Sequence, residues 1–214
     1  MYHHVLDRAV ALVVPPLCAG CTRFTDPGRW ICADCQRALT EMAPGRLSES
    51  SAAAFPYEGV VRPLIAALKF RGAVAIAREL ADLMRPRLPN WLEDAEWIVP
   101  VPAHPARRRA RGYNQSLLLA RALARSTDAK VVDCLRRTQN TSPQSQLSRA
   151  KRLEFPRQAI SIDERILRQH DRNSLVQIPT KVVLCDDVAT TGVTLEVCAQ
   201  AIREWHHPTG SSLV

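Results

Sequence analysis

The 214-residue chain lacks the features that define several classes of protein. No apolar run approaches the roughly 20 residues that a membrane-spanning helix needs, so the sequence predicts no membrane span. There is no internal repeat and no low-complexity tract. The composition, with 46% hydrophobic and 23% charged residues, is that of an ordinary globular protein. These features exclude a fibre, a repeat array and a disordered chain.

The amino-terminal stretch, from Met1 to Leu17, lacks the basic start, apolar centre and small-residue cleavage site of a secretory signal. We therefore expect a cytoplasmic, reducing location, where cysteines are metal ligands, catalytic groups or core residues more often than disulfides. Val5 to Val14 is expected to form a short helix that docks on the domain and ends at a proline pair. A membrane-surface helix is the alternative interpretation of this segment.

Lysine is scarce, since the 29 basic residues include only four lysines and therefore 25 arginines. The formal net charge of +8 favours acidic partners such as nucleic acid, phosphorylated metabolites or anionic lipid. Residues 103–157 hold 13 basic and three acidic residues, a net of +10, whereas the remainder holds 16 basic and 18 acidic residues, a net of −2. The positive excess therefore lies in one central stretch.

Two parts of the chain differ in composition. Residues 18–35 are bounded by cysteines, and a polar linker of small residues follows them through Ala52. This linker predicts a domain boundary, with an amino-terminal helix, a cysteine segment and the linker in residues 1–52 and a second domain in residues 53–214.

Helix and strand patterns alternate from Phe55 onward, which predicts an α/β domain with a mostly parallel sheet. Asn114 is placed to cap one of the helices. The expected helices are 60–70, 73–84, 115–125 and 194–205, and the expected strands are 97–101, 131–132 and 181–185.

Four of the seven cysteines form two C-x-x-C pairs separated by ten residues. Each pair lets two thiolates reach one ion from a tight turn, so we expect a structural four-cysteine zinc site. A redox dithiol and an iron–sulfur cluster are the alternatives. Cys134, Cys185 and Cys198 stand in apolar surroundings and are expected in the core. The expected zinc ligands are Cys18, Cys21, Cys32 and Cys35.

A short apolar strand at 182–185 leads into two adjacent acids, a loop of small and hydroxyl residues, and a helix. Open α/β sheets bind ligands at the carboxyl ends of their strands. Backbone N–H groups in such a loop suit a phosphate, while carboxylates accept hydrogen bonds from ribose hydroxyls. The pattern predicts a sugar-phosphate site, the alternative being an acidic turn before an ordinary helix. Its expected residues are Asp186, Asp187, Ala189, Thr190, Thr191, Gly192 and Thr194.

This segment resembles the phosphoribosyl-pyrophosphate (PRPP) motif of type I phosphoribosyltransferases. Other segments narrow the resemblance to the ComF family, and together they cover residues 5–160 and 181–203. The segments that carry it are 18–35, Ala67–Gly72, Val99–Pro102, Arg111–Gln115, and Arg137-Thr138 followed by Thr141, Gln144, Leu147 and Arg152.

The resemblance implies a type I phosphoribosyltransferase-like fold with a small amino-terminal four-cysteine zinc ribbon or knuckle. It also implies that PRPP binds together with Mg²⁺. The implied role is DNA uptake during natural transformation, or the use of external DNA, with a ComFA-type helicase as partner.

Three interpretations of the basic stretch remain open. Its arginines would bind the pyrophosphate of PRPP, some of them on a mobile arm; they would bind the backbone of single-stranded DNA; or they solvate helix faces. The stretch has only Tyr113 and Phe155 for base stacking, so DNA binding would depend on the backbone and on salt. The residues expected to bind pyrophosphate or nucleic-acid phosphate are Arg107, Arg108, Arg109, Arg111, Arg137 and Arg152.

Two functional hypotheses follow. In the first, the chain is a PRPP-binding, zinc-containing protein that binds single-stranded DNA and supports DNA uptake. In the second, it is an active phosphoribosyltransferase that acts on an unidentified nucleobase-like acceptor. Catalysis at PRPP relies on charge placed around the pyrophosphate and Mg²⁺ more than on a strong base, so we assign no catalytic residue.

Overall fold

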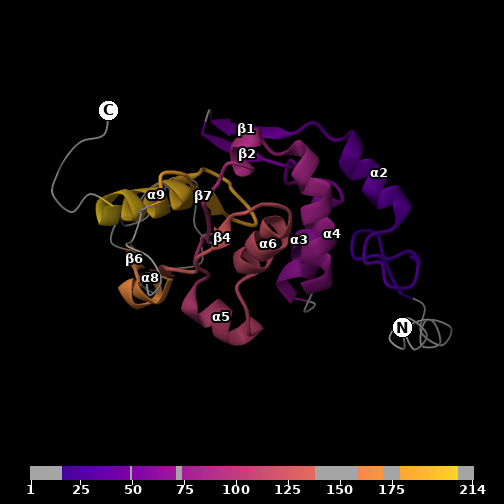
Figure 1. Cartoon of the computed structure of the whole chain (residues 1–214). Helices are drawn as coiled ribbons and strands as arrows, with labels where there is room; N and C mark the ends of the chain where they lie inside the picture. Colours follow the sequence, from indigo (N-terminus) through magenta and orange to yellow (C-terminus); the bar gives the residue numbers. More distant parts are fainter. Residues whose placement is uncertain (1–15, 49, 71–73, 138–158, 171–178, 207–214) are drawn as a thin grey trace. The chain divides into compact units, whose positions relative to one another are not determined.

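The computed structural model describes residues 16–48, 50–70, 74–137, 159–170 and 179–206 (Figure 1). The expected helix at Val5–Val14 and the segment 138–158, which contains Arg149 and Arg152, lie outside these residues. The chain forms two compact units, Met1–Pro89 and Asn90–Val214.

The first unit contains helices α2 (Ala33–Glu41), α3 (Val61–Phe70) and α4 (Val74–Met84) and a hairpin of β1 (Gly45–Ser48) and β2 (Ser51–Ala53). In α3, the buried residues Val61, Leu64, Ile65 and Leu68 recur at the spacing of one helical face. A short 3-10 turn at Arg85–Arg87 ends the unit. Fully buried side chains here include Ile31, Leu39, Leu64, Leu68 and Ile76.

One arginine ties the end of this unit to its hairpin and α2. Arg87 donates from Nε to the carbonyl oxygen of Ala54 (3.0 Å) and from Nη1 to that of Thr40 (3.1 Å). It also donates to the carbonyl oxygen of Met42, and its guanidinium lies 5.0 Å from the centre of the Phe55 ring. The segment expected to be a linker is therefore partly a hairpin with its own packing.

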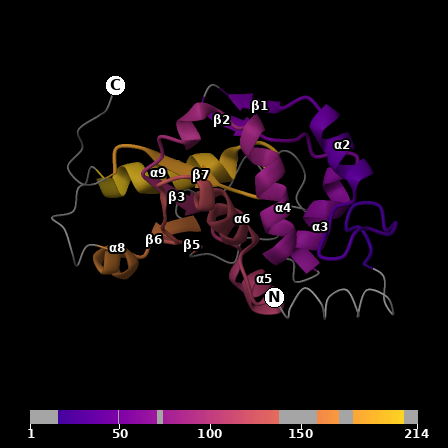
Figure 2. The same cartoon turned by 45° about the vertical axis from the view of Figure 1, so that its right-hand side comes forward.

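The second unit is built on a parallel three-stranded sheet in the order β4–β3–β7. Figure 1 labels β4 and β7, and Figure 2 labels β3 and β7 from another side. The strands are β3 (Trp97–Pro100), β4 (Lys130–Val131) and β7 (Val182–Cys185). Helix α6 (Gln115–Leu123) packs on β3 and β7, and α9 (Val193–His206) packs on β7. The expected α/β class and parallel sheet are confirmed.

A second, antiparallel pair of strands flanks the segment 138–158. These strands are β5 (Leu135–Arg137) and β6 (Ile160–Ile162), and α8 (Glu164–His170) follows them. Arg136 of β5 links the residue two positions before this strand to the residue directly after β6, because it contacts Asp133 at 3.4 Å and Asp163 at 3.5 Å. Val99 of β3, Leu135 of β5, Ile160 of β6 and Val197 of α9 share one buried core.

The helix α5 (Pro105–Arg111) was not among those expected from the sequence, and the arginines of residues 107–111 lie on it. Within the first unit, Glu79 of α4 accepts hydrogen bonds from the backbone N–H groups of Trp30 and Ile31 in the cysteine segment. The expected domain boundary after Ala52 stays a prediction. Among the described residues, no helix combines the length and apolarity that crossing a membrane would require.

The central strand gives a direct test of this core. Ile98 is fully buried in β3, so Ile98→Ala should lower the free energy of unfolding by about 2–5 kcal/mol through lost burial and a cavity. Val74, which is half exposed on α4, provides the control, and Val74→Ala should change this energy by less than about 0.5 kcal/mol. Urea unfolding measures both. Equal effects of the two substitutions would contradict the placement of β3.

Candidate functional site

The acid pair lies where the sequence analysis placed it, directly after β7. Asp186 and Asp187 follow Cys185, whose carbonyl oxygen accepts a hydrogen bond from the backbone N–H of Val101 at 2.9 Å. The loop then runs through the exposed Thr190 and Thr191 to α9. The seven expected sugar-phosphate residues therefore lie on one loop and the first turn of α9.

Gly192 sets the backbone at the end of this loop. Its φ of 74° lies in the left-handed region, which glycine adopts without steric cost. Its carbonyl oxygen accepts the first hydrogen bond of α9, from the backbone N–H of Glu196 at 3.0 Å. The loop can therefore turn sharply and aim the amino terminus of a 14-residue helix toward the strand end.

The first residues of α6 hold the two acids. Ser116 donates from its hydroxyl to Asp186 Oδ1 at 2.9 Å, and Gln115 donates from its amide nitrogen to Asp187 Oδ1 at 3.2 Å. Asp186 Oδ1 also accepts from the backbone N–H of Asp187 at 2.8 Å. Gln115 and Ser116 are buried, and the acids that accept from them are half-buried, so solvent only partly reaches these hydrogen bonds.

Asn114 fixes α6 in the position that makes these contacts possible. Its side-chain oxygen caps the helix by accepting from the backbone N–H of Ser116 at 3.2 Å, as its position predicts. Its amide nitrogen donates to the carbonyl oxygen of Val101 at 3.0 Å, just after β3. The sequence analysis identified this cap but gave no role to Gln115 or Ser116, whose partners lie 70 or more positions away in the chain.

Burial changes the protonation of Asp186. The buried environment, and then the neighbouring charge of Asp187, raise the pKa of Asp186 to about 8. The hydrogen bonds from the Asp187 backbone and the Ser116 hydroxyl oppose this increase without cancelling it. Without a ligand, Asp186 therefore binds a proton near neutral pH.

The arginines of α5 point in two directions. Arg107 and Arg111, one helical turn apart, are half-buried, whereas Arg108 and Arg109 are exposed. Arg111 donates from Nη1 to the side-chain oxygen of Gln115 at 3.1 Å, and Gln115 in turn contacts Asp187. This chain of hydrogen bonds joins α5 to the acid pair.

A third half-buried arginine acts on the same region. Burial and the charge of Arg107 lower the pKa of Arg137, at the end of β5, while the negative charge of Asp186 raises it. Burial and Arg107 likewise lower the pKa of Arg111, while Asp187 raises it. Arg107, Arg111 and Arg137 therefore form a group of mutually repelling cations beside two acids, a setting that favours an anionic ligand.

His104 belongs to this group, although the sequence analysis did not identify it. Its Nδ1 caps α5 by accepting from the backbone N–H of Ala106 at 3.2 Å. Burial, followed by Arg137 and Arg107, lowers the pKa of its imidazole. The sequence does carry a signal for this cap, because His104 stands directly before Pro105, and proline is common at the first position of a helix. Arg152, also expected here, lies outside the described residues.

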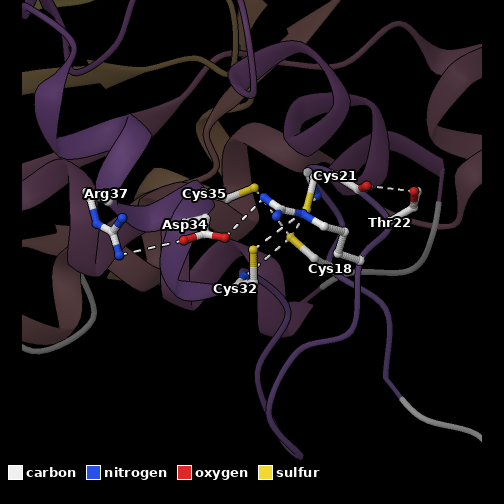
Figure 3. Close-up of polar contacts among 9 residues, drawn as sticks. Cys18, Cys21, Thr22, Cys32, Asp34, Cys35 and Arg37 are labelled. Carbon is white, nitrogen blue, oxygen red and sulfur yellow. Dashed lines mark hydrogen bonds and ion pairs between the residues drawn. The ribbon is translucent and has the colours of Figure 1, made fainter.

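The four expected cysteines converge in the first unit, as Figure 3 shows. All four sulfur atoms lie within 4.8 Å of one another, with Cys18 and Cys35 at 3.7 Å and Cys21 and Cys32 at 3.6 Å. A tetrahedral zinc ion with Zn–S bonds of about 2.3 Å places its sulfurs about 3.8 Å apart. The cluster therefore fits a metal ion such as zinc.

Backbone geometry supports the cluster. Cys18 Sγ accepts hydrogen bonds from the backbone N–H groups of Gly20 (3.4 Å) and Cys32 (3.3 Å), an arrangement that stabilises a thiolate. A Cβ on Gly20 would lie 2.7 Å from Val60 Cγ2 and 3.1 Å from Cys35 Sγ, so only glycine fits this turn. Cys134, Cys185 and Cys198 are buried, as expected.

Comparison with known proteins identifies relatives that cover most of the chain. It is 25% identical over 175 residues to "Competence protein ComFC" of Bacillus subtilis (81% of this chain, 66% of that protein). It is 32% identical over 148 residues to "Competence protein F" of Haemophilus influenzae (66% and 61%). It is 28% identical over 203 residues to "DNA utilization protein YhgH" of Escherichia coli strain K12 (87% and 83%). No family model and no solved structure matches.

The fold and the site define a class of protein, namely a mixed α/β protein with a parallel sheet, an acid pair at a strand end and a four-cysteine cluster. The relatives, named competence proteins and a DNA utilization protein and 25–32% identical over most of the chain, support a protein of the ComF type. The chain spans just under two thirds of the length of the first two relatives, at 66% and 61%.

Metal content tests the cysteine cluster. Protein purified without chelator should contain one equivalent of zinc, and Cys32→Ser should lose it because three thiolates and a hydroxyl bind zinc less tightly. Cys198→Ala, which removes a buried thiol outside the cluster, should retain the metal. Elemental analysis by mass spectrometry measures this. A metal-free wild-type protein with a reversible disulfide would contradict the zinc assignment.

The raised pKa of Asp186 predicts a pH dependence of stability. Between the pKa of the unfolded chain and about 8, the folded protein retains a proton that the unfolded chain has lost. The stabilisation that the protonated Asp186 gives the folded state is therefore complete below the pKa of the unfolded chain. As pH rises from there to about 8, the free energy of unfolding falls by at most about 1.4 kcal/mol per pH unit. Asp186→Asn should flatten this slope in urea unfolding, whereas the exposed control Asp128→Asn should retain it. An unchanged slope in Asp186→Asn would contradict the burial of this carboxyl group.

Proposed function

We propose that this chain is a cytoplasmic, zinc-containing ComF-type protein that binds PRPP and single-stranded DNA. In this proposal its second unit has a type I phosphoribosyltransferase-like fold. It supports DNA uptake in natural transformation or the use of external DNA, and a ComFA-type helicase is its expected partner. The observation that carries the proposal is the half-buried acid pair at the end of β7, held by α6 beside three half-buried arginines.

The site matches the chemistry of a sugar phosphate with a pyrophosphate group. Asp186 and Asp187 would accept hydrogen bonds from two ribose hydroxyls, and the exposed Thr190 and Thr191 with the loop N–H groups would bind the 5′-phosphate. Arg107, Arg111 and Arg137 would face the pyrophosphate. Bound Mg²⁺ would neutralise part of the pyrophosphate charge. This division of roles explains why acids and arginines lie next to one another.

Support for the DNA-related role comes from the relatives and from charge. Two relatives are named competence proteins and a third is named a DNA utilization protein. The net charge of +10 in residues 103–157 provides a counterpart for a phosphate backbone. The zinc cluster, with four protein ligands, would stabilise the first unit and leave no open position for catalysis.

An active phosphoribosyltransferase is the second candidate. It is favoured by the arginines beside the acid pair, because cations at that place would stabilise a departing pyrophosphate. Release of pyrophosphate from PRPP, screened against nucleobase-like acceptors, distinguishes the two candidates. Release that depends on an acceptor and on the acid pair would establish the enzyme. PRPP binding without release above background would contradict it.

Calorimetric titration with PRPP and Mg²⁺ tests the proposal directly. Asp186→Asn/Asp187→Asn should weaken PRPP binding about a hundredfold or more, because each hydrogen bond to a charged group contributes about 1.5–3 kcal/mol. The exposed Asp128→Asn should leave the affinity unchanged.

Two results would contradict the proposal. One is wild-type protein that does not bind PRPP. The other is a double variant that folds normally and binds PRPP as tightly as the wild type, because the acid pair would then have no part in the site.

A further inference from the structure

Helix α5 carries four arginines in seven residues, and they differ in burial. At about 100° per residue, Arg107 and Arg111 lie about 40° apart around the axis, Arg109 lies on the opposite side about 160° from Arg111, and Arg108 lies between, about 60° from Arg111. Arg107 and Arg111 are half-buried, whereas Arg108 and Arg109 are exposed. We call these pairs the inner and the outer face of α5.

The inner face is connected to the acid pair. Arg111 donates to Gln115 at 3.1 Å, and Gln115 donates to Asp187 at 3.2 Å. A phosphate bound beside these acids would therefore meet Arg107 and Arg111 but not their neighbours in the sequence.

Among the described residues, the arginines of the outer face make no contact of this kind with the acid pair. Within the part of the chain that the structure describes, neither Arg108 nor Arg109 takes part in an ion pair. Arg121 is exposed on α6, and its charge and that of Arg108 both act on the carboxyl group of Asp133. Arg108 and Arg121 therefore lie near the same carboxyl group, and both are exposed. In Figures 1 and 2 α5 lies at the edge of the second unit.

We infer that α5 separates two phosphate-binding surfaces: its inner face serves PRPP, and its outer face with Arg121 serves the backbone of single-stranded DNA, so that both ligands bind at once. This inference rests on the proposed function and deepens it, because it assigns different arginines to the two ligands. A polyanion is the matching partner, because Arg108, Arg109 and Arg121 offer exposed positive charge.

The arrangement also predicts the sign of the coupling between the ligands. Helix α5 has only seven residues and four positive charges, so it is weakly stable by itself. PRPP on the inner face would neutralise two of these charges and favour the folded helix that presents Arg108 and Arg109. PRPP should therefore strengthen DNA binding, and DNA should strengthen PRPP binding by the same factor.

Two double variants test the division. Fluorescence anisotropy with a labelled oligo-thymidine strand measures DNA affinity at several salt concentrations, and calorimetry with PRPP and Mg²⁺ measures PRPP affinity. Arg108→Ala/Arg109→Ala should weaken DNA binding, reduce the slope of log K against log salt by about 1.4 for two lost phosphate contacts, and leave the PRPP affinity unchanged. The control is Arg62→Ala/Arg78→Ala, which removes two exposed arginines of the first unit and should leave the PRPP affinity and the salt slope unchanged.

Substitutions on the inner face should affect PRPP affinity and not DNA affinity. Arg107→Ala/Arg111→Ala should weaken PRPP binding and leave DNA binding without PRPP intact. Thermal unfolding checks that this variant folds, and Arg107→Lys/Arg111→Lys, which retains the charge, should recover part of the PRPP affinity if folding is impaired.

Loss of both affinities in either folded variant would overturn the division, as would DNA binding that does not depend on Arg108 and Arg109. Failure of the wild-type protein to bind either ligand would instead reject the proposed function on which the division rests.

Discussion

Two adjacent carboxylates at the buried end of β7 need hydrogen-bond donors, and much of the second unit is arranged to supply them. An unsatisfied buried acid is costly, so its donors must be held in place. Ser116 and Gln115 supply them from the start of α6. Asn114 anchors that start to the backbone after β3, and Arg111 reaches it from the end of α5. The strand, both helices and the acids therefore depend on one another.

The same constraint gives the site its chemistry. Because Asp186 is buried next to Asp187, its pKa lies near 8, and the site binds a proton when it holds no ligand. Ribose hydroxyls would replace that proton as partners of the carboxylate, with the positive charge of Arg137 nearby to favour ionisation. Ligand binding and proton release would therefore be coupled at this strand end.

Local patterns were sufficient to predict the scaffold. The apolar run before Asp186 predicted β7, the position of Asn114 predicted the cap of α6, and the two C-x-x-C pairs predicted the sulfur cluster. Contacts between distant parts of the chain were not predictable in this way. Nothing near Ser116 in the sequence indicates that it donates to Asp186, which lies 70 positions away. In the same way, nothing near Glu79 indicates its contact with the cysteine segment. Helix α5 was not predicted because Pro105–Arg111 has no large apolar residues to give a helical pattern, although Pro105 and Gly112 are typical boundaries of a helix.

The central claim is that the acid pair and the inner face of α5 form a PRPP site that is separate from the DNA-binding surface. Titration of labelled single-stranded DNA with and without saturating PRPP and Mg²⁺ tests it most directly. The account predicts that PRPP leaves DNA bound and increases its affinity. Displacement of the DNA by PRPP, with the two ligands competing for the same arginines, would contradict it.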